Sequence, residues 1–188
     1  MGKPKVAVVV GSLRKASFNR KLATAVGRLA ANRFECSEAV IADLPLYNQD
    51  DDAHFPEAGK RFKAVIEAAD AILFVTPEYN RSIPGVLKNA IDVGSRPAGS
   101  STFAGKPAAI IGTSPGAHGT VSAQQHLRNV LSAVGAVVMP QPEIAIQFKE
   151  GLIGDDGEIE DERTQKFLQG FVDRYSKWLD LTLKSARL

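Results

Sequence analysis

Residues 11–19, Gly-Ser-Leu-Arg-Lys-Ala-Ser-Phe-Asn, place hydroxyl, amide and cationic side chains directly after an apolar run. This pattern is typical of a buried strand, a tight turn and a helix that begins near Ser17. The first amides of a helix have no internal partner and carry partial positive charge, so they suit an anion. Ser12 and Asn19 add neutral donors, and Arg14 adds a forked cation. We therefore predict a phosphate site in this loop.

The spacing of the loop narrows the choice of phosphate ligand. It matches neither the G-x-x-x-x-G-K-[ST] loop of nucleoside triphosphate sites nor the G-x-G-x-x-G turn of dinucleotide sites. A hydroxyl-rich loop after the first strand suits one terminal phosphate, as in a mononucleotide such as FMN. The alternative interpretation is purely structural: Ser17 caps the helix, and Arg14 and Lys15 are solvated.

Two further loops carry unusual residues, at 76–82 (Thr-Pro-Glu-Tyr-Asn-Arg-Ser) and 112–119 (Gly-Thr-Ser-Pro-Gly-Ala-His-Gly). Pro77 stiffens the first of them, and Tyr79 could lie beside a planar ring. Gly116 in the second allows close approach of the backbone, and the helix that follows could direct amides at a ring oxygen that gains charge on reduction. The sequence offers no catalytic triad and no metal-ligand spacing, so the chemistry must come from a bound cofactor.

Composition sets broad limits. The chain has 188 residues, 44% of them hydrophobic, and a formal net charge of +2. We expect a single domain over 1–188. Scattered cations argue against nucleic-acid binding, and no apolar run approaches the roughly 20 residues of a membrane span. The single cysteine, Cys36, excludes an internal disulfide, predicts a cytoplasmic protein, and is expected to be a small core residue.

Strands and helices alternate along the chain. Apolar runs predict strands at about 5–10, 34–41, 71–75, 108–111 and 136–139, with an irregular segment at 144–157 that has room for one short strand. Helical spacing predicts helices at about 17–31 and 56–69, one that begins at Pro84, one that ends near Val134, and one at 162–184. The acidic run 50–52 is expected to be a loop.

This alternation predicts an α/β fold with a five-stranded parallel sheet covered on both faces, in the flavodoxin-like order 2-1-3-4-5. Ligands of such sheets bind beyond the carboxyl ends of the strands, at the switch point between strands one and three. The loops 11–19, 77–82 and 114–119 should therefore meet at one site.

The residues of these loops resemble the NAD(P)H-dependent FMN reductase family, and above all its bacterial chromate and quinone reductase branch. The likeness rests on Gly-Ser-Leu-Arg-Lys-x-Ser-x-Asn at 11–19, Thr-Pro-Glu-Tyr-Asn at 76–80 and Ser-x-Pro-Gly-x-Leu-Lys-Asn-Ala-Ile-Asp at 82–92. Ser-Pro-Gly at 114–116 and Leu-Arg at 127–128 extend it.

The resemblance implies a flavodoxin-like fold, non-covalent FMN, electrons from NADPH or NADH, and a homodimer or homotetramer that reduces quinones, chromate or similar acceptors. It assigns Ser12, Arg14, Ser17 and Asn19 to the phosphate, and Pro77, Glu78, Tyr79, Asn80, Ser114 and Gly116 to the ring. Tyr79 and Arg81 are the candidate substrate contacts. Arg81 stands where an aromatic residue is common in the family. Arg81 and Arg96 either attract an anionic acceptor or a nucleotide phosphate, or are simply solvated.

We therefore expect a two-step oxidoreductase with ping-pong kinetics, in which NAD(P)H reduces the flavin and the acceptor then reoxidises it. Three alternatives remain. A flavodoxin-type electron carrier would lack turnover of NAD(P)H, and such carriers are usually strongly acidic. A phospho-acceptor receiver domain would need acidic residues where Gly11–Ser12 and Thr76–Pro77 stand. A nucleotide hydrolase or transferase could use Glu78 as its nucleophile.

Overall fold

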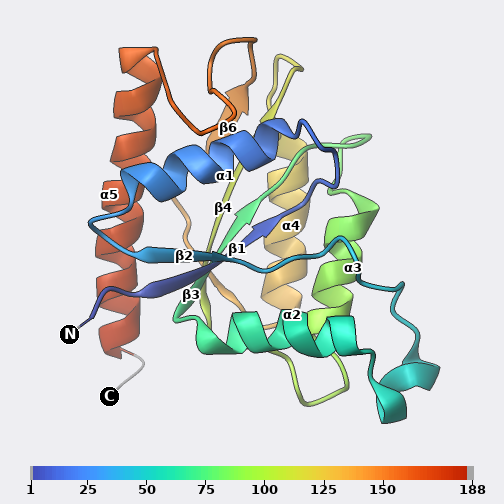
Figure 1. The fold of residues 1–188 in the computed structure, drawn as a ribbon. Coiled ribbons are helices and arrows are strands. Elements are labelled where there is room, and N and C mark those ends of the chain that lie inside the picture. The colour runs from blue at the N-terminus through green and yellow to red at the C-terminus, as the bar shows by residue number, and fades with distance from the viewer. Residues whose placement is uncertain (1, 186–188) are drawn as a thin grey trace.

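The computed structural model describes residues 2–185, which form a parallel sheet with helices on both faces (Figure 1). The central strands are β1 (Lys5–Val10), β3 (Ala71–Val75) and β4 (Pro107–Ser114), with β2 (Glu35–Glu38) and β5 (Val137–Val138) at the edges. The order β2-β1-β3-β4-β5 confirms the predicted topology, and every pairing along it is parallel.

Strand β4 is longer than predicted and has two successive neighbours on its outer side. β5 pairs with Pro107 and Ala108, whereas β6 (Ile144–Gln147) pairs with the last four residues of β4, from Ile111 to Ser114. Two short strands thus share the fifth position of the sheet. The second of them supports the end of β4, where the loop 114–119 begins.

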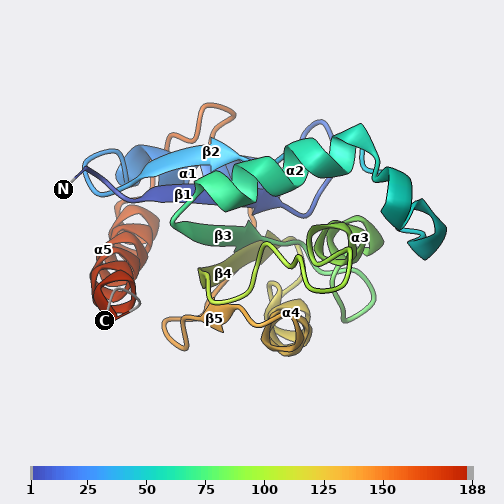
Figure 2. The same ribbon diagram turned by 90° about the horizontal axis from the view of Figure 1, so that it is seen from below.

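The helices divide between the two faces (Figure 2). Helices α1 (Phe18–Leu29) and α5 (Glu162–Ser185) pack on one face, and α2 (Glu57–Ala68), α3 (Gly85–Gly94) and α4 (Val121–Ala133) pack on the other. Because successive strand residues point to opposite faces, both faces of the central strands are apolar. Among residues 2–185 no helix has the length and hydropathy needed to span a membrane.

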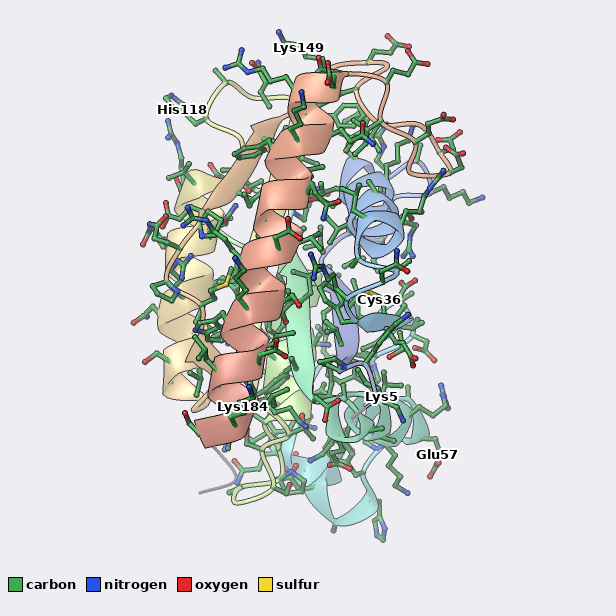
Figure 3. All side chains as sticks on the ribbon, turned by 90° about the vertical axis from the view of Figure 1, so that its left-hand side faces the viewer. Lys5, Cys36, Glu57, His118, Lys149 and Lys184 are labelled. Atoms are coloured by element: carbon green, nitrogen blue, oxygen red, sulfur yellow. The ribbon has the colours of Figure 1, made fainter. Side chains whose placement is uncertain are left out.

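The edge of the sheet departs from expectation. Strand β2 covers four residues rather than the predicted 34–41, and all four are exposed because β2 has a neighbour on one side only. The prediction that Cys36 is a core residue is therefore wrong, since the residue is exposed. Its sulfur lies close to Gly27 of α1, where desolvation raises the pKa of the thiol to about 11. Figure 3 shows Cys36 on β2, and His118 in the loop after β4 at the upper end of the molecule.

The segment between β2 and α2 also differs from the predicted loop. It contains a 3₁₀ helix, Gln49–His54, whose first turn carries the acidic run 50–52. Asn48 caps this turn, because its side-chain oxygen accepts a hydrogen bond from the amide of Asp50 (3.2 Å). Asn48 thus marks the start of a short helix in a segment whose acidic residues predicted a loop.

Candidate active site

Three loops at the carboxyl edge of the sheet line one cleft of about 250 Å³. The lining residues are Ser12, Arg14, Ser17, Phe18 and Asn19 from the first loop, Pro77, Glu78 and Tyr79 from the second, and Thr113, Ser114 and Pro115 from the third. The convergence expected from the strand order is thus observed, and Figure 1 shows the loops after β1 and β3 side by side. The other predicted site residues, Asn80, Arg81 and Gly116, belong to the same loops but do not line the cleft.

The first loop ends at the N-terminus of α1, where hydrogen-bond donors are unpaired. Ser17 is the N-cap of α1, and its hydroxyl oxygen accepts a hydrogen bond from the amide of Arg20 (3.3 Å). Ser17 therefore has the helix-capping role of the alternative interpretation. Its hydroxyl proton nevertheless remains free to donate. Within the described chain the amides of Phe18 and Asn19 make no hydrogen bond. Ser12 is buried, and its hydroxyl oxygen accepts a weak bond from the amide of Arg14 (3.4 Å).

Asn19 joins α1 to the end of β4. Its side-chain nitrogen donates to the carbonyl oxygen of Thr113 (2.9 Å), and its side-chain oxygen accepts from the amide of Thr113 (3.0 Å). Strand β3 pairs with β4 only as far as Ile111, so Asn19 occupies the place that a longer β3 would fill. Asn19 is 3% exposed, and both polar atoms of its side chain are used within the protein. Its backbone amide makes no hydrogen bond within residues 2–185 and can donate to an anion.

The second loop forms a tight hairpin. The amide of Tyr79 donates to the carbonyl oxygen of Ser82, and the amide of Ser82 donates to that of Tyr79, both at 3.0 Å. The two residues between them, Asn80 and Arg81, have positive φ angles of 50° and 67°. Two consecutive left-handed residues are typical of a type I′ turn, in which arginine is strained and asparagine is not. The hairpin leaves Tyr79, which lines the cleft, 56% exposed.

Helix α4 holds this hairpin at both ends. A carboxylate oxygen of Glu78 accepts from the amide of Ala123 in the first turn of α4 (3.0 Å). One turn further, Nδ1 of His126 lies 3.0 Å from the hydroxyl oxygen of Ser82. Sequence reasoning finds no nucleophile or partner beside His126, because no local signal identifies Ser82, 44 residues away, as its neighbour. Glu78 thus acts as a cap of α4 within the same chain.

The third loop rests on β6. The hydroxyl oxygen of Ser114 accepts from the amide of Gly116 (3.2 Å), and the Gln147 side chain donates to the carbonyl oxygen of Pro115 (3.2 Å). Gly119 has φ +58°, and a Cβ there would lie 2.8 Å from the backbone of Ala145. Only glycine lets this loop lie so close to β6, which fixes the path from β4 to the N-terminus of α4.

Arg96 lies outside the cleft. Its guanidinium lies over the Tyr47 ring, 5.8 Å from the ring centroid, and the Tyr47 hydroxyl donates to the Asp52 carboxylate (3.3 Å). Desolvation and the neighbouring carboxylate of Asp52 raise the pKa of Tyr47, which stays protonated at neutral pH. Of the two arginines considered for anion attraction, only Arg81 belongs to a loop of the cleft.

The cleft fits a phosphorylated planar ligand such as FMN. One end offers a cation, two hydroxyls and unpaired helix amides, which are the groups that bind a phosphate dianion. The other end offers an exposed aromatic hairpin and a loop that leads into the positive end of α4. Glu78, the carboxylate that lines the cleft, is turned to an α4 amide rather than to the first loop.

Comparisons with known proteins agree with this geometry. The family model described as NADPH-dependent FMN reductase matches residues 4–151. A 2-hydroxy-1,4-benzoquinone reductase from Burkholderia sp. is 54% identical over 175 residues, which cover 93% of this chain and 96% of the relative. A quinone reductase from Pseudomonas putida is 50% identical over 177 residues, covering 94% and 95%.

Solved structures give the same result. The flavoenzyme NAD(P)H:(acceptor) oxidoreductase FerB from Paracoccus denitrificans superposes with a TM-score of 0.92 at 50% identity, covering 95% of this chain and 98% of FerB. A flavodoxin from Pseudomonas aeruginosa shares the fold at 17% identity, with a TM-score of 0.57 over 94% of this chain and 99% of its own. The resemblance inferred from the motifs is confirmed, and the chain belongs to the NADPH-dependent FMN reductase family.

Proposed function

We propose that the cleft holds FMN, and that the protein uses it to reduce quinones with electrons from NADPH or NADH. The observation that carries this function is the convergence of a cationic, hydroxyl-rich helix start with an exposed tyrosine hairpin in one cleft. The phosphate would lie against Arg14, Ser12, Ser17 and the amides of Phe18 and Asn19. The ring would lie against the second loop and against Ser114 and Gly116.

Bound FMN supplies the redox chemistry, since it takes a hydride from NAD(P)H and returns two electrons to an acceptor. The chain supplies orientation and charge. Arg14 and the first amides of α1 offset the phosphate charge. The bonds from Glu78 and Ser82 to α4 fix the hairpin beside the ring, which keeps the reacting groups in register. The positive end of α4 favours negative charge on the ring side of the cleft.

The hairpin also offers a place for the second substrate. The exposed Tyr79 ring presents an aromatic face to a planar nicotinamide or quinone. Arg81, at the tip of the hairpin, adds a cation that suits chromate, an anionic quinone or a nucleotide phosphate. We propose Tyr79 and Arg81 as the substrate contacts.

Initial rates with NADPH and 1,4-benzoquinone test this function. A shared binding face requires the oxidised nucleotide to leave before the quinone enters, so double-reciprocal plots at several quinone concentrations should be parallel. Intersecting lines would contradict the shared face. Absence of NADPH turnover by the purified protein would instead identify an electron carrier, an alternative that the quinone reductase relatives do not favour.

We further propose a homodimer or homotetramer in the cytoplasm. Leu46 is 82% exposed, and a groove of about 510 Å³ between α3 and α4 is lined in part by Ile83 and Val130. Exposed apolar surface of this kind is typical of subunit contacts. Light scattering after size-exclusion chromatography should give two or four times the chain mass of 20.1 kDa, and a monomer would contradict the assembly.

A further inference from the structure

Three planar side chains, those of Arg14, Phe18 and Phe148, form a stack at the first loop. The guanidinium carbon of Arg14 lies 4.6 Å from the ring centroid of Phe18. The Phe18 ring lies against the Phe148 ring, with 3.9 Å between centroids and 16° between planes. Phe18 is the first residue of α1, whereas Phe148 directly follows β6, so the stack joins two distant parts of the chain.

The stack orients a cation that has no ion-pair partner. Within residues 2–185 no carboxylate forms a salt bridge with Arg14, and its side chain donates no hydrogen bond. Stacking on an aromatic face fixes the plane of a guanidinium while it leaves the N–H donors at the edge free. Those donors then remain available to phosphate oxygens in the cleft.

Phe148 is held firmly enough to act as the base of the stack. It is 8% exposed, and its amide donates to the carbonyl oxygen of Ser114 (2.8 Å). The Phe148 ring therefore restrains the Phe18 ring that Arg14 contacts. Ser114 belongs to the third loop. Phe148 therefore contacts the third loop through its backbone amide and the first loop through its stacked ring.

We propose that Phe18 and Phe148 are positioning residues for the cofactor phosphate, acting by holding Arg14 in the orientation that the phosphate requires. This inference rests on the proposed phosphate site at the first loop. Phe18 lines the cleft, whereas Phe148 is not among the lining residues. The effect of Phe148 should therefore depend on the phosphate and be transmitted through Phe18 and Arg14.

Affinities for FMN and riboflavin, measured by quenching of flavin fluorescence with the apoprotein, test the proposal because riboflavin lacks the phosphate. The Phe148→Leu and Phe18→Leu variants should bind FMN about two- to fivefold more weakly, the factor that corresponds to a cation–π contact at a partly exposed site. Riboflavin affinity should not change. Phe34→Leu, in the same core but in edge-to-face contact with Tyr175, is the matched control and should leave the ratio of the two affinities unchanged.

The Arg14→Ala background completes the test. There, Phe148→Leu should have no further effect on the ratio of FMN to riboflavin affinity. If Arg14→Ala alone leaves that ratio unchanged, both the phosphate site and the proposal are overturned. If Arg14→Ala lowers the ratio but the two phenylalanine variants do not, or if they weaken both flavins equally, the phosphate site stands and the positioning role is overturned.

Discussion

Asn19 gives the clearest separation between a binding role and a structural role. Both polar atoms of its side chain bond to the backbone of Thr113, 94 residues further along the chain. Replacement by alanine would leave the amide and carbonyl of Thr113 unpaired beside the buried end of β4. We therefore expect Asn19→Ala to destabilise the protein even without cofactor.

The size of the effect follows from the two lost hydrogen bonds. Each buried backbone group left unsatisfied costs about 1–3 kcal/mol, so the two together cost about 2–6 kcal/mol. For a protein of this size, 1 kcal/mol shifts Tm by about 2–4 °C, so the apoprotein Tm should fall by roughly 4–24 °C. Asn19→Asp should be worse at neutral pH, because it places a buried carboxylate oxygen against the carbonyl of Thr113.

Thermal unfolding of the apoprotein, followed by circular dichroism, measures this effect. Ser12→Ala is the matched control, since Ser12 is buried in the same cleft but accepts only one weak bond. It should lower FMN affinity and leave the apoprotein Tm within about 2 °C, because a single weak hydrogen bond contributes little. The structural role would be refuted if the Asn19→Ala apoprotein had the same Tm as the native apoprotein and lost only the stabilisation by FMN.

Three further outcomes are expected. Arg81→Gly should remove the strain of a left-handed arginine (φ 67°) and leave Tm equal or higher, while KM for NADPH rises; an unchanged KM would contradict the contact. Thr164, through its hydroxyl and its amide, holds the pKa of Asp161 below its usual range. The stabilisation is therefore present at neutral pH and lost as pH falls through that lowered pKa. The Tm deficit of Asp161→Ala should shrink in acid titrations below about pH 4; a constant deficit would disagree. Tyr175→Phe removes the 3.0 Å bond to the Ile72 carbonyl and should cost about 1 kcal/mol in urea unfolding, and an equal midpoint would argue against it.

Strand order and the position of the site could be predicted from the sequence because they follow from local patterns. The run Ala71–Val75 is apolar throughout, which indicates a strand covered on both faces, and Thr76–Pro77 marks its end. Once five such strands alternate with helices, the switch-point rule places the three loops together.

Contacts between distant residues could not be predicted in this way. The bonds of Asn19 to Thr113, of Glu78 to Ala123 and of Ser82 to His126 join positions 44 or more residues apart, and no sequence period specifies them. The error at Cys36 has a related cause. Whether an edge strand is covered depends on how far its flanking helices reach, which a single sequence does not show.

The absorbance spectrum of the purified protein, recorded without air before and after addition of NADPH and then of 1,4-benzoquinone, shows whether a bound flavin passes electrons from NADPH to a quinone. We expect flavin bands that bleach with NADPH and return with the quinone. A bound flavin that neither NADPH nor NADH bleaches, or a protein that takes up no flavin when FMN is supplied, would contradict this expectation.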